Sequence, residues 1–560
     1  MSAATVVDGR ANRWPLVSIA VIAVVAWGAV LLAPNARYWD DWVASLDPLG
    51  LYHDIGLPWM GPISQALFFV GPWTFKLLGL IALVAIGCLS YLIAGRGLAL
   101  TRFERWLVAV LLLVLPFNLA RVGVAVLDTY TWCLALFVVA WYLLVRKDPT
   151  SPGVARYLVA AALLFASYTT ASLLPFTLVP LGHLALLVAS RSERPVRDLL
   201  RGAGRFWYLL AAPIVFWVVR TLFFQPSGLY LDYNTFVRFT RPLSLAAKDV
   251  IVLGAVGLAV VLALAVLELR WPLNRRPLRV LACLGLSVLA GGLAVTVYLA
   301  GSGHYGAREV IAAILGVSAI LTLVTAWRMA VAPNSAELRA PLRMLAVGLL
   351  LFVLGAVPYV LVDKVPSFDS WDTRNQLLLP FGTAVIALAG IRSVARVPIA
   401  GRVVGAVAVA ASVLVALAAS LGLVADANKQ SQLTAALRAS DQARGARTIV
   451  VEDATTSLNF DQKEHSVFTV LGWFRTAFHD QTRYVLDPRD IAAFVESGPV
   501  EGAAYGGRYG YRDYQVSTSG TLLRIEPAPG ATWWGLLLDQ PSVSITLTPV
   551  PDISTLEPAP

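Results

Sequence analysis

The sequence predicts a membrane all-α fold, a polytopic bundle of about 13 transmembrane helices, followed by a C-terminal extracytoplasmic soluble domain that is α/β or β-rich. Composition predicts the bundle, because 58% of the 560 residues are hydrophobic, 14% are charged and the mean hydropathy is +0.70. Soluble domains are about 45–50% apolar and 25% charged, so soluble and disordered chains are excluded. A return of polar, proline and glycine residues after position 425 predicts the second domain.

The bundle is predicted from apolar runs. A helix needs about 20 residues to cross about 30 Å of hydrocarbon, and shorter runs suffice when they are buried among neighbours. We expect spans at 15–33, 73–94, 106–120, 129–145, 157–171, 173–189, 206–224, 245–267, 280–300, 310–327, 344–362, 377–391 and 403–425. Residues 1–425 therefore form the predicted transmembrane domain, and residues 426–560 form the predicted C-terminal domain.

Positive charge alternates between the loops of this arrangement. One set of loops, which includes the arginine-rich segment 191–205, carries about three times as many lysines and arginines as the other set. This asymmetry predicts an N-terminus on the inner side and, after 13 spans, a C-terminal domain on the outer side. Heavy use of arginine, alanine and leucine is typical of high-GC bacteria, which favours a bacterial cytoplasmic membrane.

The first outer loop, 34–72, carries two adjacent carboxylates, Asp40 and Asp41, between two tryptophans. Neighbouring carboxylates at a low-dielectric boundary require a proton, a cation or hydrogen bonds, so the pair predicts proton transfer or metal coordination. A helix cap with tryptophans as interface anchors is the alternative. His53 and Asp54 in the same loop are candidates for substrate contact, and segment 58–62 predicts an irregular turn.

Three later outer loops add polar residues. Arg308, Lys364 and Arg374 lie on the outer side, against the positive-inside rule, and predict a phosphate site because guanidinium groups bind phosphate bidentately. Local pairing with acidic neighbours is the alternative. The further substrate-loop candidates are Asp232, His304 and Glu309.

Several function classes lack their sequence motifs. The spans contain neither a central acidic pair nor a regular arginine series, which disfavours a pump or an ion-coupled transporter. The sequence contains no glycine-rich phosphate loop and no His/Cys spacing for zinc, so ATP hydrolysis and a zinc site are not expected.

The C-terminal domain is predicted from short apolar runs between proline and glycine residues. We expect a helix at 466–478, a disordered tail after 549, and strands at 448–452, 483–486, 520–525, 534–538 and 542–549. Its aromatic residues, above all those of segment 505–514, could stack on sugar rings, although core packing is the alternative.

These features together resemble the GT-C superfamily of integral membrane glycosyltransferases, and the residues that carry the resemblance most specifically are Trp39-Asp40-Asp41-Trp42. The chain is most similar to bacterial polyprenyl-phosphate-dependent transferases, including arabinofuranosyltransferases and enzymes that modify O-antigen or pilin. The resemblance implies a polyprenyl-phosphate-linked sugar donor and a glycan, lipid or protein acceptor, and no nucleic acid.

The resemblance also implies roles for residues. Asp40 or Asp41 would be the general base, while Arg308, Lys364 and Arg374 would hold the donor phosphate. No cofactor is required because phosphate is already a good leaving group, although a divalent cation could bind the acidic pair. A lipid-linked oligosaccharide polymerase or ligase, and a non-enzymatic flippase or transporter, remain alternatives.

Overall fold

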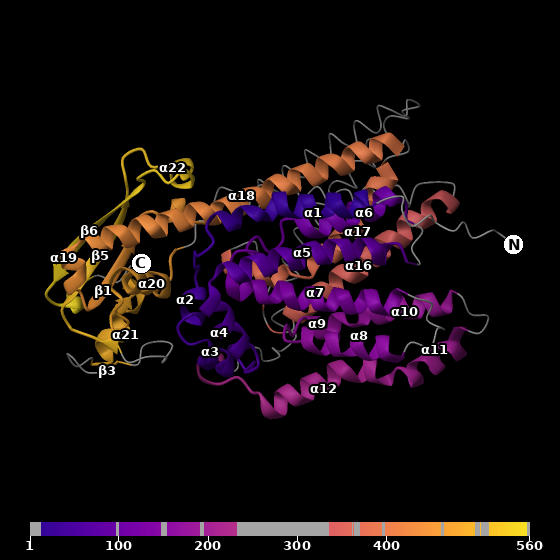
Figure 1. The fold of residues 1–560 in the computed structure, drawn as a ribbon, viewed down its shortest axis with the longest axis horizontal. Coiled ribbons are helices and arrows are strands. Elements are labelled where there is room, and N and C mark those ends of the chain that lie inside the picture. The colour runs from indigo at the N-terminus through magenta and orange to yellow at the C-terminus, as the bar shows by residue number, and fades with distance from the viewer. Residues whose placement is uncertain are drawn as a thin grey trace, which may run out of the picture.

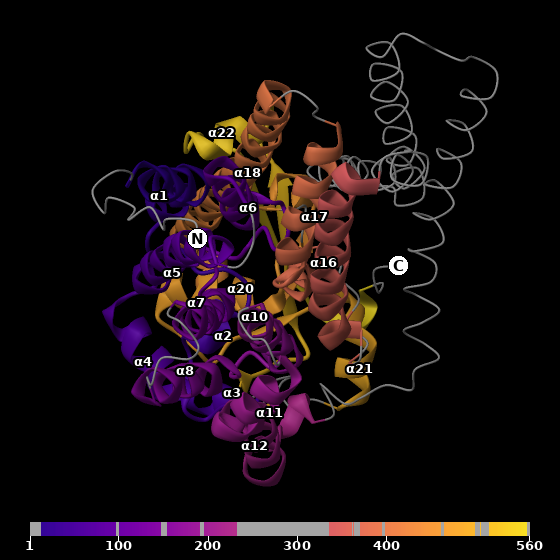
Figure 2. The same ribbon diagram turned by 90° about the vertical axis from the view of Figure 1, so that its right-hand side faces the viewer.

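A computed structural model describes residues 13–96, 100–146, 154–190, 195–231, 335–360, 362, 364, 370–394, 398–460, 464–498, 504–505 and 514–556. The structure is 70% helical. Long apolar helices run side by side along the long axis and form a helical body, and a small sheet with its own helices forms a C-terminal unit at one end (Figure 1). Viewed from the opposite end, α18 and α12 lie on opposite sides of the helical body (Figure 2).

The helical body consists of apolar helices that pack through buried leucine, alanine and aromatic side chains. Its principal helices are α1 (Trp14–Trp27), α5 (Trp73–Ala94), α6 (Arg102–Val114), α7 (Ala125–Val145), α8 (Val154–Ser167), α9 (Leu173–Phe176), α10 (Leu178–Ala189), α11 (Pro195–Arg205), α12 (Trp207–Phe223), α16 (Ser335–Val360), α17 (Leu379–Val394) and α18 (Pro398–Ala439).

Four helices of the described residues are long and apolar enough to cross a membrane, namely Trp14–Leu32, Trp73–Ala94, Ala125–Val145 and Gly401–Ala439. A fifth is added if Val196–Gly202 and Trp207–Phe223, which meet at 53°, count as one span. This number is smaller than the 13 expected. Three expected spans, 245–267, 280–300 and 310–327, lie outside the described residues, and several others coincide with shorter apolar helices.

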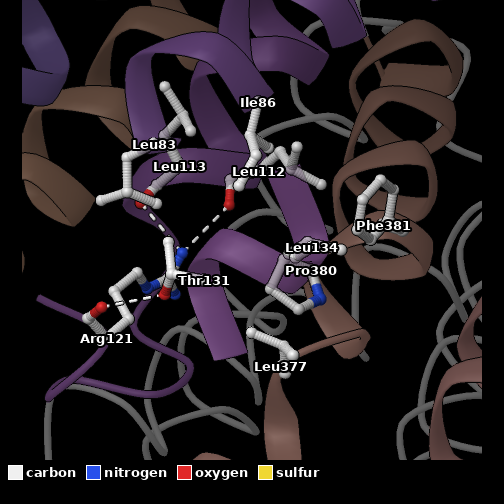
Figure 3. Close-up of a pocket in the computed structure, with 10 residues that line it drawn as sticks. All are labelled: Leu83, Ile86, Leu112, Leu113, Arg121, Thr131, Leu134, Leu377, Pro380 and Phe381. Atoms are coloured by element: carbon white, nitrogen blue, oxygen red, sulfur yellow. Dashed lines mark hydrogen bonds between the residues drawn. The ribbon is translucent and has the colours of Figure 1, made fainter. Parts of the chain in front are cut away.

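The expected span at 106–120 shows why an apolar run can yield a short helix. Helix α6 ends at Val114, and residues 115–124 continue as buried non-helical chain. Arg121 donates hydrogen bonds to the carbonyls of Leu112 (3.3 Å), Leu113 (3.2 Å) and Leu115 (3.0 Å), as Figure 3 shows for the first two. Non-helical backbone at membrane depth requires such partners. Arg121, a basic residue of an expected outer loop, therefore has a structural role.

The C-terminal unit contains a four-stranded sheet in the order β2-β1-β5-β6. Strand β1 (Thr448–Asp453) pairs in parallel with β2 (Tyr484–Leu486) and β5 (Gly520–Pro527), and β6 (Val543–Val550) pairs antiparallel with β5. Helix α20 (Val467–Phe478) packs on this sheet through buried aromatic side chains. The smaller elements are α19 (Asp441–Gly445), α21 (Ile491–Glu496), α22 (Trp533–Leu537) and the β3–β4 pair at Ala504–Tyr505 and Tyr514–Gln515.

Four of the five predicted strands and the predicted helix are confirmed. The strand predicted at 534–538 is wrong, because this segment forms α22, where the Thr532 side chain caps the helix by accepting a hydrogen bond from the Gly535 N–H at 3.0 Å. The tail is also more ordered than predicted. Strand β6 reaches Val550, and Ile553 is buried in the C-terminal unit.

Helix α18 connects the two parts without a break. It crosses the boundary expected at 425/426 and ends only at Ala439, and Leu433 and Leu437 of its last turns are buried in the core of the C-terminal unit. Because an uninterrupted helix enters that core, the C-terminal unit is held at a fixed height above the helical body.

Candidate functional site

The first loop folds into three short helices, α2 (Asp41–Ala44), α3 (Pro48–Asp54) and α4 (Met60–Val70), which lie between the helical body and the C-terminal unit (Figure 1). The irregular turn predicted at 58–62 is confirmed only for residues 58–59, because α4 begins at Met60. Trp42 attaches this loop to α20, because its ring fills the space that a side chain at Gly472 would occupy.

Asp41 is the most constrained carboxylate of this loop. Its side chain is 1% exposed. Oδ2 accepts a hydrogen bond from the Tyr38 N–H at 3.1 Å, and Oδ1 accepts one from the Val126 N–H, also at 3.1 Å. Val126 lies in the first turn of α7, where unpaired N–H groups and the helix dipole favour a negative charge. Asp41 therefore joins the loop to the start of a membrane-spanning helix.

Burial dominates the electrostatics of Asp41. Removal from water raises the pKa of this carboxyl from 3.8 to about 6, although its backbone N–H partners and the nearby ammonium of Lys76 act in the opposite direction. A pKa near 6 lies close to physiological pH, which is typical of groups that exchange protons in enzymes.

Two further charged side chains are buried beside Asp41. Lys76 of α5 donates a hydrogen bond to the Ala33 carbonyl, and its Nζ lies 5.2 Å from the centre of the Tyr38 ring. Asp128 of α7 is fully buried, and a Cβ at Gly79 would lie 2.3 Å from its Oδ1, so the glycine makes room for the carboxylate. Lys76 is attracted by both Asp41 and Asp128.

Sequence analysis did not predict Lys76 or Asp128, because it considered only acidic pairs at the centre of a span. The pattern that could have identified them is simpler. Each is a single ionisable residue in the first turn of a long apolar helix, and an ionisable residue within a span is by itself a candidate for function.

The structure distinguishes the two neighbouring carboxylates. Asp40 is half-buried at the start of α2, and its side chain makes no capping hydrogen bond to that helix. The preceding residue, Trp39, is buried with a φ of 46°, a left-handed conformation that is unusual for a bulky side chain. This local strain turns the chain so that Asp41 points to α7 while Asp40 remains accessible.

A cavity of about 450 Å³ lies between α4, α7, α8 and α12. Most of its lining is apolar, with Met60, Trp132 and Phe216 among the contributing side chains. Trp59 closes one side, since its Nε1 donates to Thr169 Oγ1 at 3.1 Å and its ring meets Phe224 edge-on.

The cavity borders the apolar exterior of the helical body and also lies near the contact between Asp41 and α7. Two of its lining residues, Ile63 and Phe165, are 48% and 38% exposed, so the cavity continues into the apolar exterior of the helical body. Thr129 also lines it and lies one helical turn, about 4.5 Å along α7, from the Val126 N–H that binds Asp41.

Arg220 provides the positive charge of this cavity. It lies in the last turn of α12, half-buried, and its Nη2 donates to the Ile55 carbonyl at 3.5 Å. Sequence analysis did not predict this residue, although an arginine near the end of an apolar helix was visible.

Family models, curated proteins and solved structures contain no match to this chain.

The other predicted residues lie at different places. His53 is exposed and lies 3.7 Å from Asp54, whose carboxylate accepts a hydrogen bond from Ser227 Oγ at 3.0 Å. Asp54 thus ties α3 to the segment after α12. Arg374 lies half-buried in a 3₁₀ helix, Ser370–Gln376, and interacts electrostatically with Tyr359 of α16. The Lys364 N–H donates to the Tyr359 carbonyl at 2.9 Å.

Four predicted residues, Asp232, His304, Arg308 and Glu309, lie outside the described residues. Within the described part of the chain, no three His, Cys, Asp or Glu side chains gather in a way that could hold a metal ion. Both carboxylate oxygens of Asp41 accept backbone hydrogen bonds, and a divalent cation at the acidic pair stays a prediction.

A second buried polar cluster joins α18 to the C-terminal unit. Lys429 of α18 is fully buried and lies 3.3 Å from the Asp453 carboxylate and 3.3 Å from the Thr455 carbonyl. His465 lies 3.3 Å from Asp426, and both side chains are buried. Since Asp426 and Lys429 belong to α18 and their partners belong to the C-terminal unit, the cluster fixes the orientation of the unit on the helix.

Proposed function

We propose that this chain is a membrane glycosyltransferase, which moves a sugar from a polyprenyl-phosphate donor to a glycan, lipid or protein acceptor of the cell envelope. One observation carries the proposal. Asp41, the buried member of the acidic pair, binds an N–H of α7 within about one helical turn of an apolar cavity that is also lined by an arginine, and Asp40 precedes it in the chain.

The cavity supports a donor with a hydrocarbon chain. Its apolar lining would accommodate isoprenoid carbons, and its continuity with the apolar exterior would admit a lipid from the bilayer. The guanidinium of Arg220 would bind the phosphate. Lys364, Arg374 and Arg308 remain candidates for the same role.

The carboxylates support general-base catalysis. Asp40 is the accessible member of the pair, so we assign it the acceptor hydroxyl, and Asp41 positions it by anchoring the loop to α7. The acceptor proton passes to the carboxylate while the acceptor oxygen bonds to the anomeric carbon. The bond from that carbon to the phosphate oxygen breaks, and its electron pair leaves with the phosphate. A single displacement of this kind inverts the anomeric configuration.

The membrane arrangement belongs to the same proposal. The catalytic domain would comprise 13 spans in a bacterial cytoplasmic membrane, with the N-terminus inside and the C-terminal unit outside, where lipid-linked sugars replace nucleotide sugars as donors.

One observation favours an alternative. Lys76 and Asp128 are buried ionisable residues near the ends of two spans, as a proton relay of a transporter or flippase would require. The lining of the adjacent cavity is largely apolar, which suits a lipid better than an ion.

Transfer by the purified protein in nanodiscs, from a panel of polyprenyl-phosphate sugars, tests the proposal. Asp40→Asn should lower the rate at least about a hundredfold without changing the melting temperature. Asp490→Asn removes an exposed carboxylate of the C-terminal unit and serves as the matched control. Equal transfer by the wild type and Asp40→Asn would refute the assignment of the base, and lipid translocation without transfer would favour the flippase.

A further inference from the structure

Helix α22 is attached to α18 at a defined height. Asn428 of α18 donates from Nδ2 to the carbonyls of Leu536 (2.9 Å) and Leu537 (3.3 Å). Leu536 is buried in one cluster with Ala425 of α18. These contacts fix α22 beside residues 425–428, and α18 is continuous through this region.

The apolar part of α18 sets the height of the bilayer at this point. Between Arg402 and Asp426 the helix has no ionisable residue, and at 1.5 Å per residue this stretch is about 35 Å long. It therefore spans the roughly 30 Å of hydrocarbon, and the headgroup layer occupies about 5–7 Å beyond it. Asn428 lies three residues past Ala425, about 4.5 Å farther along the axis, so α22 lies at the level of that layer.

The free face of α22 is apolar. Trp534 is 64% exposed and Leu538 is 68% exposed, and their spacing of four residues places them on the same face. In both views α22 lies at the rim of the molecule, on the outer side of α18 (Figures 1 and 2). The two exposed side chains therefore belong to an element at the rim of the molecule, at the height where tryptophan is enriched in membrane proteins.

We propose that the exposed face of α22 inserts into the headgroup layer of the bilayer and holds the C-terminal unit on the membrane surface. The bilayer is the occupant that the position of this face favours, because α22 lies against Ala425 and Asn428, which continue at helical spacing the exposed side of α18 that carries Leu414 and Ala418. Sugar stacking on Trp534 is the competing use of the same surface. The proposal rests on the placement of α18 in a membrane, and not on glycosyltransferase activity.

Photocrosslinking of the full chain in phospholipid nanodiscs tests it. A photoreactive p-benzoylphenylalanine replaces Trp534 or Leu538 in separate variants, and mass spectrometry identifies the molecules captured on irradiation. Leu414, 65% exposed in the apolar part of α18, is the positive control. Gln442, exposed in α19, is the negative control, because the end of α18 at Ala439 is about 16 Å beyond Asn428.

The expected result is a phospholipid adduct at positions 414, 534 and 538 and none at position 442. An adduct at 414 alone would overturn the proposal while leaving the span intact. Capture of an added soluble oligosaccharide at 534 in place of lipid would also overturn it, in favour of sugar stacking. Absence of lipid at all four positions would overturn the membrane placement of α18 and the proposal with it.

Discussion

The contact between Trp42 and Gly472 can be tested by a substitution whose cost follows from the structure. A Cβ added at Gly472 would lie 2.2 Å from Cδ2 of the Trp42 ring, whereas ordinary contacts begin at 3.4 Å, so Gly472→Ala requires a displacement of more than 1 Å. Such overpacking costs about 1–3 kcal/mol. Alanine in the middle of α20 recovers about 1 kcal/mol of helix propensity, so the net loss is about 0–2 kcal/mol.

The companion variant removes the ring. In a Trp42→Ala background the space beside position 472 is open, and Gly472→Ala should stabilise α20 by about 1 kcal/mol. The two substitutions are therefore coupled by about 2 kcal/mol, a size that double-mutant cycles resolve. Gly182→Ala in α10 is the matched control, because a Cβ there meets no atom within 4 Å. It should be stabilising in both backgrounds.

Native-state hydrogen exchange of the α20 amides measures these effects, because it gives local opening free energies without reversible unfolding of the whole chain. Gly472→Ala should destabilise α20 when the Trp42 ring is present and stabilise α20 in the Trp42→Ala background. An equal effect of Gly472→Ala with and without the Trp42 ring would show that the first loop does not pack on α20, and would refute the argument.

Three other predictions concern buried charges. The pKa of Asp41 is raised from 3.8 to about 6 in the folded chain, so the folded chain holds a proton that the unfolded chain has lost. The free energy of unfolding should therefore fall by about 3 kcal/mol as pH rises from about 4 to above 6. Melting temperatures across this range should show the decrease, and an equally large decrease in the Asp41→Asn variant would contradict it. Lys429→Ala leaves Asp453 buried without its cation and should destabilise the C-terminal unit by about 3–5 kcal/mol, measured as opening free energies by hydrogen exchange. The double variant with Asp453→Asn should recover part of this loss. Losses that simply add in the double variant would count against the pairing. Arg220→Ala should raise the donor KM about ten- to a hundredfold with a smaller change in kcat, because a charged hydrogen bond to phosphate is lost; an unchanged KM would remove Arg220 from the donor site.

Local elements were predictable because their determinants lie close together in sequence. The helix at 466–478 was recognisable from its apolar pattern, and Ser466 caps it by accepting a hydrogen bond from Thr469 N–H. Strands β1, β5 and β6 are runs of branched apolar residues between turns. The strand predicted at 534–538 is a helix because the residues after the capping Thr532, which are bulky and apolar apart from Gly535, fit a helix and a strand equally well.

The site was predictable only in part, because most of it arises from contacts between distant segments. The acidic pair was recognisable as two adjacent aspartates in the sequence. Its division into a buried Asp41 and an accessible Asp40 depends on Val126 in another helix. Likewise the cavity requires four helices to meet, and no single segment carries a pattern for it. Among the described residues, fewer helices than expected are long enough to cross a membrane, because the apolar content of a run does not determine whether its whole length is helical, as residues 115–124 show.

The contact of the first loop with α18 also has a consequence for biosynthesis. The Tyr38 hydroxyl donates to the Leu423 carbonyl at 2.6 Å, and these residues are 385 positions apart in sequence. At a synthesis rate of about 5–20 residues per second, the loop waits about 20–80 s after its own translation before this partner exists. Throughout that interval the hydrogen bond between the first loop and α18 cannot form. A chain that stops before Leu423 would therefore lack this connection between α18 and the loop that carries Asp40 and Asp41.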